Sequence, residues 1–441
     1  MYKLIENHIT QNLPFLKESK TLIAISGGVD SVVLAYLSHK LNLNIALAHC
    51  NFNLRGKESD ADEDFVFKLA EELNLEVFVE HFDTEKYAKE SKQSIQMAAR
   101  ELRYNWFDEL AKQLQFDYIL TGHHADDNLE TFLINLTRGT GLEGLTGIPE
   151  VNNKFVRPLL PFSREQIETF AKDNVISWRN DSSNASTKYL RNKLRHDVIP
   201  ILKEINPNLL QSFQNTLNNL SDTADIIEES TATVLKQAIE TKDSESIAYK
   251  ISEFKKLKNP KAYLFEAFKT YGFTEWDDVA NLLDAQSGKQ VFSRTHRLIK
   301  DRSHFLLSKI PPEIIEGDIK QDVSILENDD KVEIPLGTLF LEEVEAVLDK
   351  SPNTIYVDKE LLKYPLILRK KTEGDIFYPL GMKGKKKLSK YFKDEKLSLL
   401  DKENTWLLCS GDAIVWVVNR RADNRYRVTE KTKNILKIKL D

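Results

Sequence analysis

The first 200 residues alternate short apolar runs with longer amphipathic stretches, and this alternation constrains the fold more than any other feature of the chain. The short runs are typical of buried strands, and the longer stretches carry apolar residues at helical spacing. The expected strands are Thr21–Ile25, Asn44–His49, Leu75–His81 and Asp117–Thr121, and the expected helices are Ser31–Leu41, Glu58–Leu73 and Gln93–Leu114. Crossovers of this length predict an α/β fold with a doubly wound, Rossmann-like parallel sheet, whose ligands bind beyond the carboxyl ends of the strands.

The remaining sequence changes character twice. A polar stretch with helical patterning and almost no glycine covers Glu204–Lys256, and from about Asp322 the apolar runs shorten to strand length, as in Lys331–Ile334, Thr338–Leu341 and Ala413–Val418. A chain of 441 residues is also too long for one ordinary core. We therefore predict an α/β domain over residues 1–205, a helical domain over 206–321 and a small α+β domain over 322–441.

Charge is distributed unevenly along the chain. The net charge is −6, yet residues 351–441 hold 21 Lys and Arg against 12 Asp and Glu, so the rest of the chain is acidic. A basic terminal domain on an acidic body predicts a polyanionic partner.

Cysteine content and hydropathy bear on the compartment. Cys50 and Cys409 are the only cysteines and are far apart, which argues against a disulfide framework or a zinc ribbon. The first ten residues lack the apolar core of a signal peptide, and the longest apolar runs are far shorter than the roughly 20 residues that span a bilayer. We expect a cytoplasmic protein with no membrane role, and the sequence leaves a homodimer open.

The strongest local signal is the hexapeptide Ser26-Gly27-Gly28-Val29-Asp30-Ser31, which lies between an expected strand and an expected helix. Its glycines let the backbone approach a phosphate, and the first amides of the helix supply donors and a favourable dipole. A serine-capped glycine turn is the plainer alternative. The hexapeptide lacks the Gly-Lys-Ser/Thr ending of a Walker loop and resembles the signature of the PP-loop ATP pyrophosphatases, which cleave ATP between the α and β phosphates.

Further segments resemble the tRNA(Ile)-lysidine synthase family in composition and order. In the first domain they are Ala46–Gly56, Ala99–Tyr104, Thr121–Thr131, Arg138–Gly141, Arg157–Leu159 and Trp178–Asp181. Phe52 departs from the family, in which histidine often stands at that position. Near the end of the chain, Pro365–Lys371, Pro379–Leu388 and Arg420–Asp423 are similar to the C-terminal domain of the long form of the family.

The Thr121–Thr131 segment carries two histidines and then a helix on which Asp127 and Glu130 share one face. Grouped carboxylates suit Mg²⁺ or the ammonium groups of a small cationic substrate. A zinc site formed by His123, His124 and an aspartate competes, but adjacent histidines after a strand point to opposite sides. Simple capping of the sheet and of the helix is the plain alternative.

Basic residues form two groups in the first domain. Arg100 and Arg103 lie three residues apart on an expected helix, and a guanidinium can grip a phosphate in bidentate fashion. Surface ion pairing near Glu101 is the alternative. Arg191 and Arg195 either contact the nucleic acid or close the domain.

A third basic group lies in the terminal domain, where Lys383–Lys390 contains five lysines in eight residues. Such a run is usually a solvated face, but the basic domain around it favours binding of a phosphate backbone. The residues that we expect to contact tRNA are Lys385, Lys386, Lys387, Arg420 and Arg421.

The family resemblance implies a ligase that uses ATP, Mg²⁺ and free L-lysine to convert the wobble cytidine of the isoleucine tRNA with a CAU anticodon to lysidine. It implies that the hexapeptide binds ATP and that Asp30 holds Mg²⁺ and pyrophosphate. Arg103 and His123 are implied at the α-phosphate, and Asp127 and Glu130 at the lysine substrate or the metal. The implied catalytic residues are thus Asp30, Arg103, His123 and Asp127.

Two alternatives use the same features. A PP-loop tRNA thiolation enzyme would need a persulfide or an iron-sulfur cluster, and Cys50 is the only cysteine in the first domain, with no C-x-x-C partner. A catalytically inactive tRNA-binding protein would not need the intact Ser26–Ser31 loop.

Overall fold

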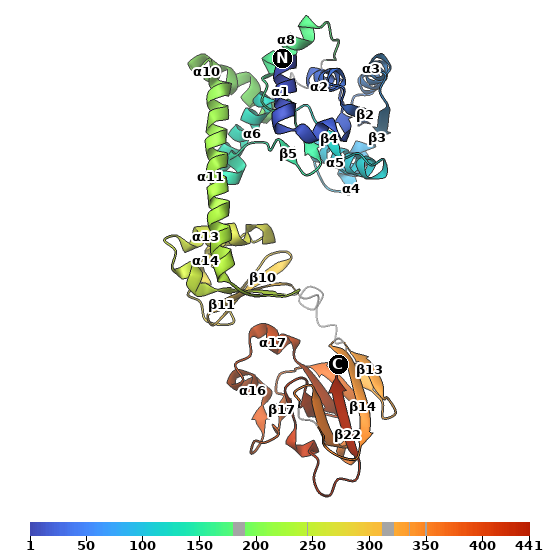
Figure 1. Ribbon diagram of the computed structural model, residues 1–441, viewed down its shortest axis with the longest axis vertical. Coiled ribbons are helices and arrows are strands. Elements are labelled where there is room, and N and C mark those ends of the chain that lie inside the picture. Colours follow the sequence, from blue (N-terminus) through green and yellow to red (C-terminus); the bar gives the residue numbers. More distant parts are fainter. Residues whose placement is uncertain (180–189, 245, 311–321, 335, 349–350) are drawn as a thin grey trace. The chain divides into compact units, whose positions relative to one another are not determined.

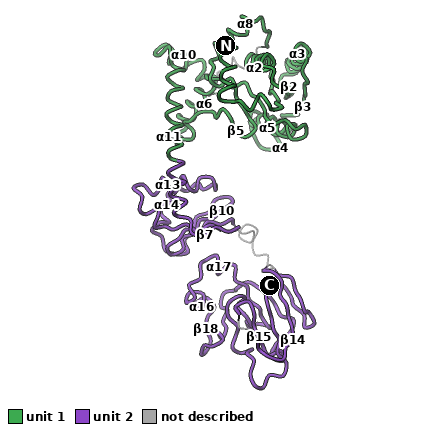
Figure 2. Tube along the Cα trace, in the orientation of Figure 1, with its two compact units in different colours: residues 1–227 green, residues 228–441 purple. Residues whose placement is uncertain are grey.

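The computed structural model describes residues 1–179, 190–244, 246–310, 322–334, 336–348 and 351–441 (Figure 1). The chain forms two compact units, Met1–Ile227 and Glu228–Asp441 (Figure 2). Within the described ranges, no helix is both long and apolar enough to cross a membrane.

A six-stranded sheet forms the centre of the first unit, with the order β3-β2-β1-β4-β6-β5. The strands are β1 (Lys20–Ala24), β2 (Asn44–Asn51), β3 (Val77–His81), β4 (Tyr118–Leu120), β5 (Val151–Asn152) and β6 (Phe155–Val156). All pair in parallel except β5, an antiparallel edge strand. The order reverses between β1 and β4, so the prediction of a doubly wound sheet is confirmed.

Helices follow these strands because the strands are apolar on both faces and need cover on each side. The helices are α1 (Tyr2–Asn12), α2 (Val29–Lys40), α3 (Lys57–Leu73), α4 (Thr84–Glu90), α5 (Ile95–Gln113), α6 (Ala125–Arg138), α7 (Leu142–Leu145) and α8 (Arg164–Asp173). Helix α2 is almost entirely buried, with Val32, Val33 and Leu34 at 0% exposure in the main core. The loop that precedes α2 is therefore held at the carboxyl end of β1.

Shorter helices continue the first unit beyond α8. They are α9 (Leu190–Lys193), a π-helical turn (Leu194–Val198) and α10 (Ile199–Ile205), followed by the long α11 (Leu209–Ala238). The start of α11 packs on α6, where Phe213 and Leu217 meet Leu129. The predicted helical character of this stretch is confirmed.

The first part of the second unit contains α12 (Ile251–Lys255), α13 (Pro260–Phe268) and α14 (Trp276–Asn281). It also contains a five-stranded antiparallel sheet that the helical prediction for 206–321 did not include. The strands are β7 (Ile239–Lys242), β8 (Ser246–Lys250), β9 (Gln290–Phe292), β10 (His296–Asp301) and β11 (His304–Lys309), in the order β7-β8-β11-β10-β9. The prediction missed this sheet because the apolar runs of its strands span only two or three residues, such as Leu298–Ile299 in β10 and Phe305–Leu307 in β11, and because β7 is mostly exposed.

The terminal part of the second unit contains two larger sheets around the buried Trp416, and a two-stranded ribbon. Sheet β12-β16-β19-β20-β21 comprises Val323–Ile325, Leu366–Lys370, Trp406–Ser410, Ala413–Val417 and Arg421–Ala422. Sheet β13-β14-β22-β15 comprises Lys331–Ile334, Gly337–Val344, Ile435–Leu440 and Thr354–Asp358. The ribbon is β17 (Ile376–Phe377) with β18 (Lys386–Lys387), and the helices are α16 (Leu388–Asp394) and α17 (Leu399–Asn404). The predicted α+β character and the strand over Lys331–Ile334 are confirmed.

Candidate functional site

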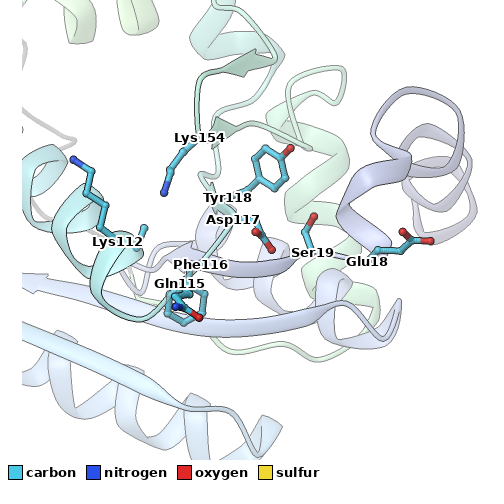
Figure 3. A pocket seen from close by; sticks show the side chains of 9 residues that line it. Glu18, Ser19, Lys112, Gln115, Phe116, Asp117, Tyr118 and Lys154 are labelled. Atoms are coloured by element: carbon cyan, nitrogen blue, oxygen red, sulfur yellow. The ribbon is translucent and has the colours of Figure 1, made fainter.

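The two ends of the first sheet, at the amino and the carboxyl ends of its strands, are surrounded by different residues. At the amino ends of β1 and β4 lies a hollow lined by residues that include Asp117, Tyr118 and Lys154 (Figure 3). The Asp117 carboxylate accepts a hydrogen bond from the Lys20 backbone N at 2.8 Å, so this end fastens two strands together. None of the predicted site residues lines the hollow, and the candidate site lies at the opposite end.

At the carboxyl ends of β1 and β4, two loops meet where the strand order reverses. A Cβ on Gly122 would lie 3.0 Å from the Asp30 carbonyl carbon and 3.0 Å from the Ser31 backbone N. Glycine is required there because only it lets the two backbones approach this closely. The contact brings the hexapeptide together with the histidines and carboxylates that follow β4, as the sheet topology predicted.

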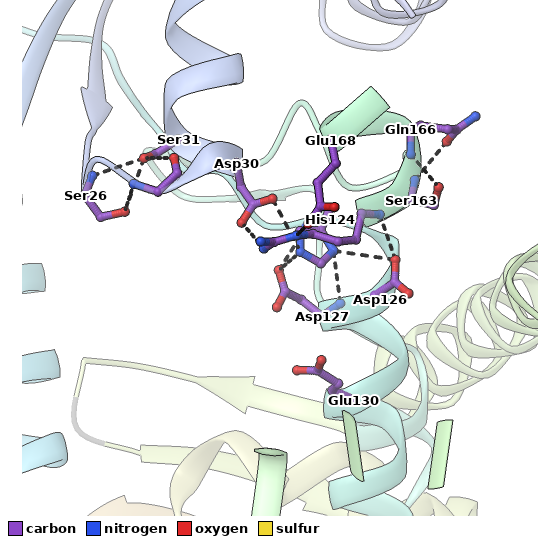
Figure 4. Close-up of polar contacts among 12 residues, drawn as sticks. Ser26, Asp30, Ser31, His124, Asp126, Asp127, Glu130, Ser163, Gln166 and Glu168 are labelled. Carbon is purple, nitrogen blue, oxygen red and sulfur yellow. Dashed lines mark hydrogen bonds and ion pairs between the residues drawn. The ribbon is translucent and has the colours of Figure 1, made fainter. Parts of the chain in front are cut away.

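The hexapeptide is held in shape by its own serines (Figure 4). Ser31 Oγ donates to the Gly28 carbonyl at 3.0 Å and accepts from the Ser26 backbone N at 3.2 Å. Gly27 adopts φ +84°, a conformation that glycine takes without strain. Within the described part of the chain no side chain caps α2, so its first amides face the position that an anion would occupy.

Asp30 faces two cationic or polar side chains from other elements (Figure 4). Arg164 Nη1 on α8 lies 2.7 Å from Oδ2, and His124 Nε2 lies 3.7 Å from Oδ1. Burial raises the pKa of Asp30, although His124 and Arg164 act in the opposite direction. Among the described residues, Oδ1 has no hydrogen-bond partner, so this buried oxygen is suited to a cation.

His124 is a capping residue rather than an open ligand. Its ring Nδ1 accepts from the Asp127 backbone N at 3.4 Å, and the Asp127 carboxylate accepts from the His124 backbone N at 3.1 Å. This reciprocal pair starts α6, so the capping alternative holds for these two residues. Across the described ranges, no group of three or more His, Cys, Asp or Glu could hold a metal ion, which gives a zinc site no support.

His123 contacts a different set of side chains from its neighbour. Its Nδ1 lies 2.9 Å from Thr121 Oγ1. Burial lowers the pKa of His123 to about 4; Asp127 opposes this shift, and Arg157 and Arg191 add to it. The imidazole is therefore neutral near pH 7 and offers a phosphate a hydrogen bond rather than a positive charge.

Glu130 is fully engaged in ion pairs. Its carboxylate is 1% exposed and receives Arg195 Nε at 2.7 Å and Arg195 Nη2 at 3.1 Å, with Arg191 Nε at 3.4 Å. Burial raises the pKa of Glu130, and Arg195 opposes the shift. Arg195 Nη2 also lies 3.5 Å from Asp127 Oδ1. Arg191 and Arg195 thus both pair with a carboxylate of α6.

Asp126 is a further member of the cluster that the sequence did not single out. Its carboxylate accepts hydrogen bonds from the Arg164 backbone N at 2.8 Å and from Lys203 Nζ at 2.7 Å. Burial acts to raise the pKa of Asp126, but these hydrogen bonds hold it below its ordinary value. Its place in the first turn of α6, beside Asp127, is the signal that could have identified it.

The two predicted phosphate-binding arginines contact different aromatic side chains. The Arg103 guanidinium carbon lies 5.1 Å from the Phe52 ring centre, and that of Arg100 lies 4.8 Å from the Tyr104 ring centre. Arg103 also acts on Cys50, where burial raises the pKa of the thiol to about 12 and Arg103 opposes the rise. The charge of Arg100 also acts on His123 and adds to the lowering of its pKa.

The predicted tRNA-binding residues in the terminal domain differ in exposure. Lys385 and Lys387 are exposed, whereas Lys386 is half-buried and its Nζ lies 2.7 Å from Asp394 Oδ2. Arg421 Nη1 donates to the Leu380 carbonyl at 3.2 Å. Arg420 and Arg421 are both partly exposed. The two exposed lysines are thus the members best placed to meet a polyanion.

Two parts of the sequence-based prediction lie outside the described residues. Asn180 and Asp181 of the Trp178–Asp181 segment fall there. Residue 321, the last residue of the predicted helical domain, falls there as well.

Comparison with family models divides the chain into three matched regions. Residues 1–202 match a PP-loop domain, residues 242–310 a TilS substrate binding domain and residues 366–440 a TilS substrate C-terminal domain.

Curated relatives match nearly the whole chain. A tRNA(Ile)-lysidine synthase of Parabacteroides distasonis is 41% identical over 95% of this chain and 95% of its own length. One of Bacteroides thetaiotaomicron is 39% identical over 97% of this chain and 96% of its own length. One of Porphyromonas gingivalis is 37% identical over 93% and 91%, respectively.

Proposed function

Since the chain belongs to the tRNA(Ile)-lysidine synthase family, we propose that the site formed by the Ser26–Ser31 loop and the Thr121–Asp127 segment carries out both steps of lysidine formation. The chain is an ATP-dependent ligase that forms a carbon–nitrogen bond. The observation that carries the proposal is the close approach at Gly122, which puts a phosphate-binding loop beside His123 and Asp127.

The first step is adenylation of the wobble cytidine in a tRNA with a CAU anticodon. The C2 oxygen attacks the α-phosphorus of ATP, the bond from the α-phosphorus to the bridging oxygen breaks, and pyrophosphate leaves. The loop amides stabilise the departing charge, and neutral His123 with Arg103 holds the α-phosphate. Bound Mg²⁺ would neutralise pyrophosphate charge, and Asp30, whose Oδ1 has no hydrogen-bond partner among the described residues, is the residue that would hold it.

The second step joins lysine to the activated base. The ε-ammonium has an ordinary pKa near 10.4 and must transfer a proton to a nearby carboxylate or histidine of the site before its nitrogen attacks C2. The C2–O bond then breaks and AMP leaves. We assign the binding of lysine to Asp127 and Glu130. Because the Arg195 guanidinium already lies on both carboxylates, the substrate ammonium would share or replace its position.

The remaining partners follow from the same proposal. The basic terminal domain supports tRNA binding through Lys385 and Lys387, with Lys386, Arg420 and Arg421 nearby in sequence. ATP and tRNA as substrates support a cytoplasmic location.

Asp30→Ala tests the role of the loop. We expect the variant to lose pyrophosphate release in the presence of ATP and the CAU-anticodon tRNA while retaining tRNA in a filter-binding assay. Lys112→Gln is a matched control, because Lys112 also forms a carboxylate ion pair but lies on α5 at the other end of the sheet. Wild-type rates of pyrophosphate release in Asp30→Ala would contradict the proposal.

A further inference from the structure

The Arg103 guanidinium contacts an aromatic ring rather than a carboxylate. Its central carbon lies 5.1 Å from the Phe52 ring centre, within the range of a cation–π contact. Arg164 and Arg195 each pair with a carboxylate, whereas among the described residues the exposed Arg103 has no such pair. Because Arg103 is attracted to a ring face and not to an acceptor oxygen, its planar fork of N–H donors stays available to an anion.

The Phe52 ring is itself fixed by other aromatic rings. It stacks on Phe82, with ring centres 5.7 Å apart and an interplanar angle of 22°. Phe82 in turn meets Trp106 edge to face, with ring centres 6.3 Å apart. Trp106 follows Arg103 by three residues on α5, so these two side chains lie on one face of that helix. The four side chains therefore form a chain of contacts that starts and ends on α5.

Phe52 lies at the carboxyl end of β2. It directly follows Asn51, the last residue of that strand. Three residues before Phe52, His49 Nδ1 lies 2.9 Å from the carbonyl oxygen of Ile25, the residue that precedes the Ser26–Ser31 loop. Phe52 therefore belongs to the same edge of the sheet as the loop.

We propose that Phe52 is a positioning residue whose ring holds the Arg103 guanidinium where it receives the α-phosphate of ATP. The proposal rests on the role that the proposed function gives to Arg103. An arginine side chain loses much rotamer freedom when it is fixed. The ring removes part of that freedom before the nucleotide binds, so binding of the phosphate costs less side-chain entropy.

Calorimetric titration with AMP, and separately with adenosine, tests the proposal on the full-length protein. Phe52→Leu removes the ring face and should weaken AMP binding about threefold or more. Arg103→Gln should weaken AMP binding about tenfold or more. Phe52→Tyr keeps the ring and should stay within about twofold of the wild-type affinity for AMP. The dissociation constant for adenosine should change less than about twofold in every variant, because adenosine carries no phosphate.

A double variant shows whether the ring acts through the guanidinium. In the Arg103→Gln background, Phe52→Leu should have no further effect on AMP binding. Phe67→Leu is the matched control, because Phe67 is an exposed phenylalanine on α3, and it should match the wild type with both ligands. The Tm of each variant shows whether it is folded. If Phe52→Leu is unfolded, Phe52→Met provides the same comparison.

Wild-type affinity of Phe52→Leu for AMP would overturn the proposal, as would equal losses in Phe52→Leu and Phe52→Tyr. Equal weakening of AMP and adenosine binding would also overturn it, because the ring would then contact the base or merely support the fold. A wild type that binds AMP no more tightly than adenosine would have the same consequence. Lysidine formation by the wild type is measured separately, so its absence would contradict the proposed function without deciding whether Phe52 positions Arg103.

Discussion

The Arg195 guanidinium lies against both carboxylate oxygens of Glu130, with Nε 2.7 Å from Oε1 and Nη2 3.1 Å from Oε2. The two residues are 65 positions apart in the chain. A side chain expected to receive a cationic substrate thus already carries a cation from the protein. The ammonium of a lysine substrate bound by Glu130 would therefore compete with the Arg195 guanidinium.

A double-mutant cycle measures the strength of this pair. Arg195→Gln leaves the buried Glu130 carboxylate without its main partner, so we expect a loss of about 1–3 kcal/mol in the free energy of unfolding. In the Glu130→Gln background, Arg195→Gln should cost less, giving a coupling energy of about 0.5–3 kcal/mol. Denaturant titration of the four proteins provides the values. Strict additivity would show that the two side chains do not interact.

Asp127→Asn separates lysine binding from helix capping. The asparagine side-chain oxygen can still accept the His124 backbone N–H that the Asp127 carboxylate accepts, so the start of α6 and the Tm should be preserved. Loss of the negative charge should raise KM for lysine about tenfold or more, with KM for ATP little changed. Steady-state kinetics with each substrate varied in turn checks this. An equal rise in both KM values would contradict the assignment of Asp127 to lysine.

Gly122→Ala tests the contact between the two loops. The added Cβ would lie 3.0 Å from backbone atoms of Asp30 and Ser31, which cannot move aside as a flexible side chain would. We expect a loss of about 1–3 kcal/mol in stability, together with loss of ATP turnover. Gly141→Ala is the control for stability, because a Cβ there meets nothing within 4 Å. A Gly122→Ala protein with wild-type Tm and turnover would show that the close approach is not needed.

The pH dependence of His123 follows from its burial. Its pKa falls from an ordinary 6.5 to about 4 on folding. Between about pH 4 and pH 6.5 the unfolded chain binds a proton at this histidine that the folded chain does not bind. The contribution of His123 to the free energy of unfolding is therefore complete above pH 6.5 and is lost as the pH falls toward 4. An NMR titration of the assigned imidazole should therefore show no inflection between pH 5.5 and 8, in contrast to an ordinary histidine. A midpoint near 6.5 would contradict the neutral role assigned to this residue.

The lysines of the terminal domain should differ in their contribution to tRNA binding. Lys385→Gln and Lys387→Gln should each weaken binding and reduce the slope of log K against log salt by about 0.7–1. Lys386→Gln should change it less, because Lys386 is paired with Asp394. Lys331→Gln, an exposed change on β13, is the control. Equal effects of all four changes would indicate nonspecific attraction to a basic domain.

Local patterns predicted much of the first domain. The strand before the hexapeptide and the glycines within it are local features, so the Ser26–Ser31 loop could be predicted from adjacent residues. The capping of α6 is local as well, since His124 and Asp127 are three residues apart.

Long-range ion pairs were not predictable in the same way. Arg164 reaches Asp30 across 134 residues, and Arg179 reaches Asp62 across 117. Side-chain spacing along one helix carries no information about such partners. The sheet formed by β7 to β11 was missed for a related reason, because its strands are defined by their pairing and their apolar runs, such as Phe305–Leu307, span only two or three residues.

The most direct test of the central claim is incorporation of labelled L-lysine into the CAU-anticodon isoleucine tRNA in the presence of ATP. The proposed chemistry predicts alkali-stable label on the tRNA, with one AMP and one pyrophosphate released for each lysine joined. Unlabelled tRNA would contradict the account, and sulfur incorporation in place of lysine would instead identify a thiolation enzyme.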